Sequence, residues 1–375
     1  MSLDFDEFDS LEAKSEEVED KYEDIEPKGI TFGIIGVGQG GCRLADTFYQ
    51  IGYRKIILFN TTEKDMQGVN APRKHWIVPT ESDGAGKDVE IGEKVAKTCI
   101  PDLVKKMNTM FKNVTNILIC VGAGGGSGTG SASIFANACK QWVYDSSGDY
   151  SGTKVGFLVA LPARSESSKV LSNTSYLLSK IVDDKYSPII FVDNQRIAQA
   201  VRANALNKWQ QSNKLVCNLF DVFNSMSAKE TELDTFDPKD YADVLAHGVT
   251  TMAIAGIPES ALSINDSDLA RDTILSDKVK TTLKQSMLLQ DVDISTATHA
   301  SFIVTCRKEA LEQMDGNTIP KLSETIINMM GGDLGKSVTV HKGVYLLNEE
   351  KIRIFMLFSG MQFPKKKIEE YKMAK

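Results

Sequence analysis

The chain has 375 residues, of which 42% are hydrophobic and 25% are charged, a composition typical of a globular protein and not of a disordered or fibrous one. Residues 1–28 carry twelve acids and three lysines, whereas the whole chain carries a net charge of −7, so the remainder is close to neutral. A basic nucleic-acid-binding body is therefore excluded as the main feature. No apolar run approaches the ~20 residues of a membrane span.

Six cysteines and four histidines are scattered along the chain, and no two cysteines form a CxxC pair. Several cysteines lie in apolar runs, which indicates free thiols in a reducing compartment rather than disulfides or a zinc site. The spacing of the histidines offers no support for a metal site. We therefore expect a cytoplasmic protein with no protein-ligated metal centre and no direct contact with membrane or nucleic acid.

The first 29 residues form an acidic arm with spaced apolar residues, and Pro27-Lys28-Gly29 marks its end. One interpretation is a solvated, disordered segment, because blocks of like charge usually stay solvated. The alternative is a helix that docks on a neighbouring subunit. The sequence leaves the role of the arm open.

Residues 30–211 alternate between short apolar runs and helix-like stretches, a pattern typical of a parallel sheet covered by helices. Right-handed crossovers in such a sheet place the loops that follow the strands along one edge, where ligands bind. The expected strands are Ile30–Ile35, Lys55–Asn60, His75–Val78, Asn116–Val121, Val155–Leu161 and Pro188–Asp193. The expected helices are Cys42–Gln50, Val89–Phe111, Ser131–Tyr144 and Ser165–Val182.

A long helix is expected next, within residues 212–232, and residues 233–363 then read as a smaller α+β domain. Its expected strands are Thr250–Ala255, Ser301–Cys306, Ser337–His341 and Lys351–Phe358, with helices at Leu269–Leu288 and Leu322–Met330. The basic tail, residues 364–375, is expected to be a solvated terminus, to brace a filament or to contact an acidic partner. The fold class is thus an α/β parallel-sheet domain, a long central helix and a second α+β domain.

The first glycine motif, Gly36-Val37-Gly38-Gln39-Gly40-Gly41, directly follows a strand and opens a helix. Glycines allow the backbone to approach phosphate closely, and the helix N-terminus supplies N–H groups and partial positive charge. A dinucleotide site requires an acid at the end of the next strand. Here that strand ends with Asn60 and the acid, Glu63, arrives late. A tight strand-to-helix turn is the alternative.

The second glycine motif, Gly124–Gly130, is a stronger signal because five of its seven residues are glycine, at a cost in conformational entropy. A row of backbone N–H groups around phosphate oxygens would explain that cost. A third cluster, Gly84-Ala85-Gly86, follows the predicted strand His75–Val78, at the same edge of the sheet. Neither Gly36–Gly41 nor Gly124–Gly130 contains a lysine, so we expect Mg²⁺ to help neutralise the phosphates. Gly331–Ser337 is predicted to be a helix C-cap and turn.

Asp240 and Asp243 lie three residues apart at a predicted helix start, so both carboxylates share one face. On local sequence alone, N-terminal capping is the favoured role. Asn194 and Asn213 have amides that can donate and accept together, which suits a guanine edge, although turn formation and helix capping are open alternatives. Arg43 is a weak candidate for a contact with the base.

In this order of motifs the chain resembles the tubulin/FtsZ superfamily of polymerising GTPases over nearly the whole body, from Ile30 to Met361. Gly124–Gly130 resembles the superfamily signature, and Gly84-Ala85-Gly86 with Val89-Glu90-Ile91-Gly92 resembles the γ-phosphate loop of FtsZ. Asp240-Tyr241-Ala242-Asp243-Val244 resembles the FtsZ catalytic loop, although Pro238 replaces the usual first Asn. Leu161-Pro162, Glu166, Lys169-Val170-Leu171 and Asn173 resemble the ribose-side loop of TubZ-type partition proteins.

The resemblance implies GTP/GDP and Mg²⁺ as ligands. It also implies a head-to-tail filament in which Asp240 and Asp243 of one copy orient water against the γ-phosphate bound by the next copy. It implies a nucleotide site formed by Gly38, Gln39, Gly40, Gly41, Asn60, Gly84, Ala85, Gly86, Gly124, Gly125, Gly126, Ser127, Gly128, Thr129, Gly130, Glu166, Asn173, Asn194 and Asn213.

The TubZ-like loop favours plasmid or phage DNA segregation, with a DNA-bound adaptor as a possible partner of the tail. An FtsZ-like division GTPase, an NAD-dependent oxidoreductase and a silent structural relative are the alternatives.

Overall fold

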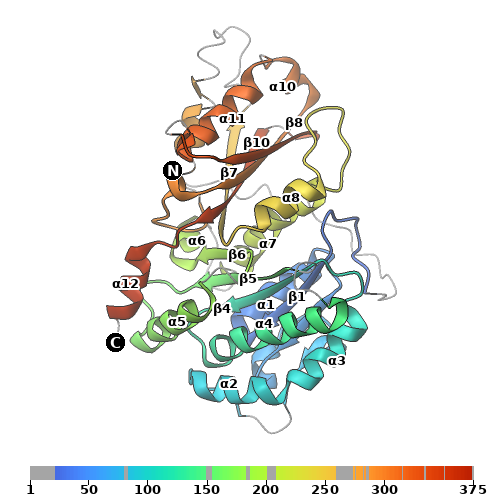
Figure 1. The fold of residues 1–375 in the computed structure, drawn as a ribbon, viewed down its shortest axis with the longest axis vertical. Coiled ribbons are helices and arrows are strands. Elements are labelled where there is room, and N and C mark those ends of the chain that lie inside the picture. Colours follow the sequence, from blue (N-terminus) through green and yellow to red (C-terminus); the bar gives the residue numbers. More distant parts are fainter. Residues whose placement is uncertain are drawn as a thin grey trace. The chain divides into compact units, whose positions relative to one another are not determined.

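The computed structural model describes residues 22–79, 83–148, 154–182, 186–200, 208–258, 273–274, 276–281, 283, 287–314, 316–332, 335–349 and 351–373. The chain divides into two compact units. The first contains residues up to Asn218 together with Pro364–Lys375, and the second contains Leu219–Phe363. Figure 1 shows the helices and strands of both units.

A parallel sheet forms the centre of the first unit, with strand order β3-β2-β1-β4-β5-β6. Nearly every strand residue is buried, because helices cover both faces of the sheet, and this explains the continuous apolar runs of the sequence. The predicted α/β fold class is confirmed for this part of the chain. The strands are β1 (Phe32–Val37), β2 (Ile56–Phe59), β3 (Trp76–Ile77), β4 (Asn116–Gly122), β5 (Lys154–Leu161) and β6 (Ile189–Asp193).

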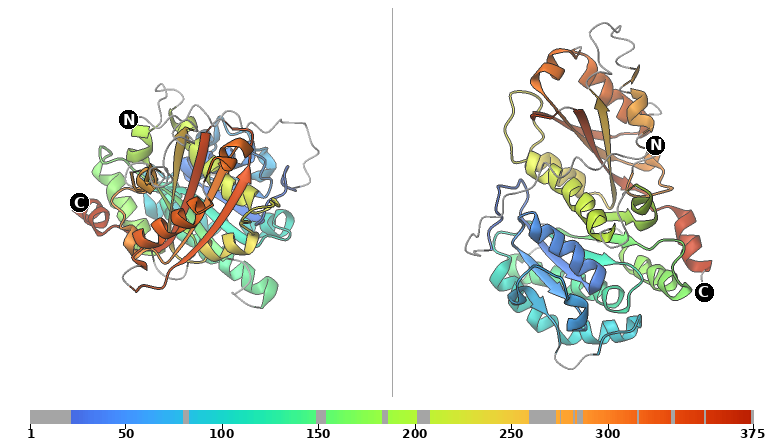
Figure 2. Two further views of the ribbon diagram at one scale, coloured as in Figure 1. Left: turned by 90° about the horizontal axis from the view of Figure 1, so that it is seen from above. Right: turned by 180° about the vertical axis from the view of Figure 1, so that it is seen from behind.

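Two predicted helices of this unit begin earlier in the structure than expected, inside the glycine motifs. α1 spans Gly38–Gln50 and α4 spans Gly126–Ser147, so the glycines form the first helical turns rather than separate loops. α4 lies in front of the sheet in Figure 1, whereas α1 covers the opposite face in the right panel of Figure 2. The unit also contains α5 (Ser168–Ile181), α6 (Asn194–Ala200) and short 3-10 turns at Glu63–Met66 and Arg73–His75.

The prediction of one helix over Val89–Phe111 is wrong, because the structure has two helices there. α2 spans Val89–Thr98 and α3 spans Ile100–Met110, with Cys99 between them. Pro101 lies in the first turn of α3, where a residue without an N–H is tolerated, but it cannot continue the hydrogen-bond ladder of α2. The apolar periodicity continues through this break and therefore conceals it.

All six cysteines are buried and lie outside any disulfide, among the apolar residues of the core. Burial raises the pKa of the thiols of Cys42, Cys120 and Cys139. These thiols are packing groups, because a thiol that stays protonated neither binds a metal nor attacks an electrophile.

A four-stranded sheet of order β7-β10-β8-β9 forms the second unit. β10 pairs antiparallel with β7 and β8, whereas β8 and β9 are parallel. The predicted helix Leu269–Leu288 lies largely outside the described residues. Helix α7 (Lys208–Met226) leads from the first unit into the second. The other elements are α8 (Pro238–Leu245), β7 (Val249–Pro258), the 3-10 turn Ile294–Thr296, β8 (His299–Cys306), α10 (Lys308–Glu312), α11 (Thr318–Met329), β9 (Thr339–Leu346) and β10 (Lys351–Met361).

The described part of the acidic arm lies on its own first unit. The backbone N–H of Arg54 donates to Oδ1 of Asp24 at 2.8 Å, and Nζ of Lys55 donates to the carbonyl of Tyr22 at 2.9 Å. Residues 1–21 lie outside the described residues. The arm therefore includes a segment that docks within the same chain, which neither sequence interpretation anticipated.

The basic tail forms helix α12 (Lys365–Met373), which packs on α5, so a fully solvated tail is not what the structure contains. Lys367 and Tyr371 are buried in it. Within the described part of the chain, no helix is both long and apolar enough to cross a lipid bilayer.

Candidate functional site

The order of the strands reverses between β1 and β4 in the first unit. β1 is followed in sequence by β2 on one side, whereas β4 lies on its other side and is followed by β5. A crevice forms at such a switch point, outside the carboxyl ends of the parallel strands. The glycine motifs Gly36–Gly41 and Gly124–Gly130 follow β1 and β4, so the fold brings both to this place.

The two motifs touch through their glycines. A Cβ atom on Gly38 would lie 2.6 Å from the backbone nitrogen of Gly128, and Gly38 has a φ of +67°. A Cβ atom on Gly92 of α2 would lie 2.3 Å from the carbonyl oxygen of Gly126. Any side chain at these positions would push the backbones apart. Glycine is thus required for the close approach of α1, α2 and α4.

The helices α1 and α4 both begin without a capping side chain. Val37 is the N-cap residue of α1 and Gly125 that of α4, and neither side chain accepts a hydrogen bond from the first turn. The N-terminal N–H groups of a helix need an acceptor and carry a partial positive charge. Two such ends that lie together suit an anion of several oxygens, such as a polyphosphate.

A buried amide at the end of β2 also fits a bound ligand. Asn60 is fully buried, and its Nδ2 has no hydrogen-bond partner among the described residues. Its neighbour Thr61 has its hydroxyl 2.6 Å from the hydroxyl of Ser127 in the second glycine motif. A buried donor without an acceptor costs free energy, about 1–3 kcal/mol, which a ligand acceptor would recover. These residues therefore fit the predicted nucleotide.

Asn173 connects the second and third glycine clusters. Its Nδ2 donates to the carbonyl of Gly124 at 3.0 Å and to the carbonyl of Lys87, next to Gly86, at 2.9 Å. Asn173 is 4% exposed, so the structure places it as a brace between the loops. Glu166, the other predicted ribose-side residue, is exposed.

Three further candidates lie elsewhere in the first unit. Asn194 is the first residue of α6, directly after Asp193, whose Oδ1 accepts from the N–H of Gln195 at 3.0 Å. Asn213 lies within α7 rather than at its start, so helix capping, one of its alternatives, does not apply. Arg43 is exposed on α1. Their roles toward a base stay predictions.

Asp240 and Asp243 lie on α8 in the second unit, as the spacing predicts. Asp237 is the N-cap residue, and Asp240 completes a capping box by accepting from the N–H of Asp237 at 3.3 Å. Pro238 is the first helical residue, a position that suits proline. The capping interpretation thus holds for Asp240. Asp243 lies one turn further on and takes no part in the cap.

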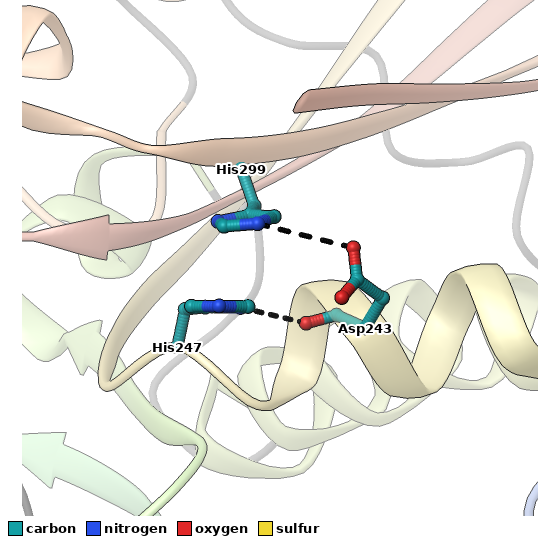
Figure 3. Close-up of side chains that lie close together, drawn as sticks. All are labelled: Asp243, His247 and His299. Carbon is teal, nitrogen blue, oxygen red and sulfur yellow. Dashed lines mark hydrogen bonds and ion pairs between the residues drawn. The ribbon is translucent and has the colours of Figure 1, made fainter. Parts of the chain in front are cut away.

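Three of the four histidines surround these aspartates, a feature that the sequence analysis missed. Nδ1 of His341 lies 2.9 Å from Oδ1 of Asp240, and its Nε2 lies 2.9 Å from Oδ2 of Asp243. Nε2 of His299 lies 3.9 Å from the same Asp243 oxygen. His247 Nδ1 lies 2.8 Å from the carbonyl oxygen of Asp243, and the rings of His247 and His299 stack 3.5 Å apart (Figure 3).

The cluster alters the acidity of its members. Partial burial acts to raise the pKa of Asp243, but the hydrogen bond to His341 and the charges of the histidines outweigh it, so the pKa lies below its ordinary value. Burial, followed by the charge of His247, lowers the pKa of His299 despite the opposing effect of Asp243. Asp243 is therefore a carboxylate near neutral pH.

The fold is thus an α/β fold, and its first site, made of main chain and glycine, has the geometry that suits a polyphosphate. Residues 32–202 match the model of the Tubulin/FtsZ family, GTPase domain. In this stretch the chain is similar to the Tubulin/FtsZ family, whose members are filament-forming GTPases.

Two known proteins illustrate how much of the chain is matched. Cell division protein FtsZ 1 of Thermococcus kodakarensis is 25% identical over 363 residues, 95% of this chain and 86% of that protein. Tubulin-like protein CetZ of Pyrococcus abyssi is 30% identical over 177 residues, 44% of this chain and 45% of that protein.

Solved structures confirm the fold. A GTPγS-form protofilament of TubZ from Bacillus thuringiensis serovar israelensis has a TM-score of 0.74 at 20% identity and covers 93% of this chain and 91% of its own. CetZ1 from Haloferax volcanii, a GDP-bound monomer, has a TM-score of 0.72 at 22% identity, with 92% and 98% covered. The predicted tubulin/FtsZ fold with TubZ-like architecture is therefore confirmed.

Proposed function

We propose that the protein is a GTPase that assembles head to tail into filaments and hydrolyses GTP where two copies meet. The observation that carries the proposal is the pair of uncapped helix N-termini, α1 and α4, that meet through glycines beside the buried amide of Asn60. Self-assembly is supported by the TubZ relatives, which were solved as protofilaments and filaments.

In this mechanism the phosphates rest on the main chain of the glycine motifs, with Thr61 and Ser127 beside them. The amides of Asn194 and Asn213 recognise guanine, and Glu166 lies on the ribose side. Asn173 fixes the second and third glycine clusters relative to each other through its hydrogen bonds to the carbonyls of Gly124 and Lys87. Bound Mg²⁺ would supply the positive charge that balances the phosphates, because neither Gly36–Gly41 nor Gly124–Gly130 contains a lysine.

Asp240 and Asp243 of one copy orient water toward the γ-phosphate held by the next copy. A carboxylate suits this role because it accepts a hydrogen bond and can take up a proton as the bond to phosphorus forms. The lowered pKa of Asp243 keeps it in the accepting form. Hydrolysis then requires assembly, because a heterologous interface supplies the second half of the site.

The cellular role is proposed to be DNA segregation or positioning of a plasmid or phage, as the ribose-side loop Leu161–Asn173 and the TubZ-like fold support. A partner carrying bound DNA could reach the basic α12 helix. Cell division is the second candidate, since FtsZ proteins are among the relatives. Association of the filaments with a DNA-bound adaptor protein favours segregation, whereas assembly into a ring at the division site favours division.

The oxidoreductase alternative explains less. A dinucleotide site would account only for Gly36–Gly41. It does not explain the second glycine motif, the contact of that motif with the first, or the hydrogen bonds of Asn173.

Phosphate release from GTP, measured at increasing protein concentration with Mg²⁺, tests the proposal. We expect turnover per chain to rise steeply where light scattering reports assembly. A turnover per chain that is the same below and above the assembly threshold contradicts hydrolysis at the interface. Binding of NAD without binding of GTP favours the oxidoreductase.

A further inference from the structure

The side chains around Asp243 come from three separate elements of the second unit. His247 follows α8, His299 begins β8 and His341 lies in β9. Ser301 is the β8 partner of His341, so His299, two residues before Ser301, points to the same face of the sheet as His341. The fold, and not the sequence spacing, gathers three of the four histidines of the chain.

The donor atoms of this cluster are close enough to share one ion. One nitrogen of His247, one of His299 and one carboxylate oxygen of Asp243 all lie within 4.8 Å of one another. The cluster is open to solvent, since the Asp243 side chain is 42% exposed and that of His299 is 17% exposed. An ion could therefore enter without any unfolding of the surrounding strands.

We propose that Asp243, His247 and His299 bind a divalent transition-metal ion of the Zn²⁺ type, with His341 fixing Asp243 by a hydrogen bond. Two imidazoles and one carboxylate are a donor set typical of Zn²⁺, Co²⁺ or Ni²⁺, whereas Mg²⁺ and Ca²⁺ prefer oxygen ligands alone. Three protein ligands leave a fourth position for water.

Binding requires a small rearrangement, which sets the expected affinity. At metal–ligand distances of about 2.1 Å, tetrahedral ligand atoms lie about 3.4 Å apart, closer than the present limit of 4.8 Å. The lone pair of an imidazole nitrogen lies in the ring plane, so one ion cannot bind two parallel rings that are 3.5 Å apart. One ring must rotate and lose its stacking, and we expect micromolar rather than nanomolar binding.

The surroundings prepare the ligands for an ion. Thr298 Oγ1 lies 2.9 Å from Nδ1 of His299, which leaves Nε2 directed at Asp243. Such second partners fix the ring orientation of metal-binding histidines. His341 holds the carboxylate of Asp243 from the other side.

Occupancy of this site has a consequence that rests on the proposed function. A metal-bound Asp243 is a weaker acceptor for the proton of the attacking water, because the ion withdraws negative charge from its carboxylate. The ion therefore inhibits hydrolysis while leaving GTP binding intact, since the glycine motifs contribute no ligand to it.

The test uses the full chain, with any purification tag removed, titrated with Co²⁺ in the absence of nucleotide. We expect visible d–d absorption that saturates at one ion per chain, with Zn²⁺ displacing it at micromolar concentration. His247→Gln and His299→Gln should each weaken binding at least ~10-fold, and His341→Gln by ~10–100-fold, as for a residue that orients a ligand.

Asp243→Asn and Asp240→Asn form a matched pair, because both side chains lie on α8 and contact His341. Only Asp243→Asn should abolish the Co²⁺ spectrum. Circular dichroism verifies that each variant is folded. Absence of the spectrum at 100-fold excess Co²⁺ in the folded wild-type chain, or equal loss in the two aspartate variants, overturns the metal site and leaves the cluster as a charge-balancing network.

A second measurement separates this inference from the proposed function. Saturating Zn²⁺ should lower GTP turnover of the wild-type chain at least ~10-fold in excess Mg²⁺ but leave GTP affinity unchanged. If the chain binds the metal but never hydrolyses GTP, the proposed function is contradicted and the inference of a metal site still stands. Unaltered turnover with Zn²⁺ bound overturns the inhibitory role of the site.

Discussion

The ammonium of Lys367 lies 2.5 Å from the carboxylate oxygen Oδ2 of Asp193, and both side chains are almost entirely buried, at 3% and 1% exposed. Lys367 belongs to α12, and Asp193 ends β6 directly before Asn194. The C-terminal helix is thus fixed to the strand that leads into a predicted guanine contact. The basic segment has a structural role that its composition does not indicate.

Removal of one partner of this ion pair should be costly. Lys367→Ala leaves the Asp193 carboxylate buried and unpaired, so we expect a loss of about 3–5 kcal/mol in the free energy of unfolding. The measurement is denaturant unfolding followed by tyrosine and tryptophan fluorescence. Lys366→Ala, at an exposed neighbour, should change stability by less than about 0.5 kcal/mol. Equal effects of the two substitutions would show that the pair contributes nothing.

Glycine substitutions can separate packing from ligand binding. A Cβ atom on Gly92 would lie 2.3 Å from the carbonyl oxygen of Gly126, so Gly92→Ala should lower stability without any ligand, by about 1–3 kcal/mol. A Cβ atom on Gly125 would meet no atom within 4 Å, and the φ of this residue is −73°. Gly125→Ala should therefore keep stability within about 0.5 kcal/mol but weaken GTP binding at least ~10-fold, because the methyl group occupies the space of the phosphates.

Gly256→Ala is the matched control, since its methyl group would also meet no atom within 4 Å and the residue lies in β7. It should leave GTP affinity unchanged. Fluorescent GTP-analogue titration and thermal unfolding report the two quantities. Undiminished GTP binding by Gly125→Ala would remove this residue from the nucleotide site.

The proposed catalytic acid gives a third prediction. Asp243→Ala should still bind GTP and form filaments, but release phosphate about 10²–10⁴-fold more slowly, because the water loses its acceptor. Malachite-green phosphate detection with parallel sedimentation measures both properties. Asp145→Ala, on the exposed last turns of α4, should behave as the wild type. Wild-type turnover in Asp243→Ala removes Asp243 from the mechanism.

Asp24 makes stability depend on pH. Burial raises the pKa of Asp24 above its ordinary value, although the hydrogen bond from Arg54 and the charges of nearby Lys55, Lys28 and Arg54 oppose it. The folded chain therefore holds this proton more tightly than the unfolded chain. The contribution of Asp24 falls as pH rises from the ordinary value of 3.8 through the raised pKa.

Asp24→Asn should remove that slope, because the amide oxygen still accepts from the N–H of Arg54 but carries no charge. Relative to the wild type, the variant should gain Tm as pH rises from 3.8 through the raised pKa, keep this advantage at higher pH and lose it near pH 3. Thermal unfolding between pH 3 and 7 provides the comparison. An advantage that grows toward low pH would reverse the assigned direction of the shift.

The features that sequence predicted well are those encoded locally. Buried strands are continuous apolar runs, so β4 and β5 were found within a residue or two. The glycines of Gly124–Gly130 predict a phosphate loop, and the structure gives them a further role, because Gly128 and Gly126 lie against the backbones of Gly38 and Gly92. Pro238 as the first helical residue and Asp237 as the cap explain why the departure from the family pattern does not disturb α8.

Features that depend on distant pairing were missed. His299 and His341 meet only through the parallel register of β8 and β9, which no local pattern encodes. The one local signal was the spacing of Asp243 and His247, four residues apart at the end of a helix. The sequence leaves the tail as a solvated terminus, a filament brace or a partner contact, and none of these predicts a buried Lys367. Its partner Asp193 is 174 residues away, so no local pattern indicates the pair.

The second unit is inserted into the first, because residues on both sides of it, up to Asn218 and from Pro364, belong to the same compact body. The chain therefore passes between the two units twice, once within α7 and once between β10 and α12. Proteolytic cleavage between β10 and α12 would leave α12 attached to the first unit only by its packing on α5 and by the ion pair of Lys367 with Asp193.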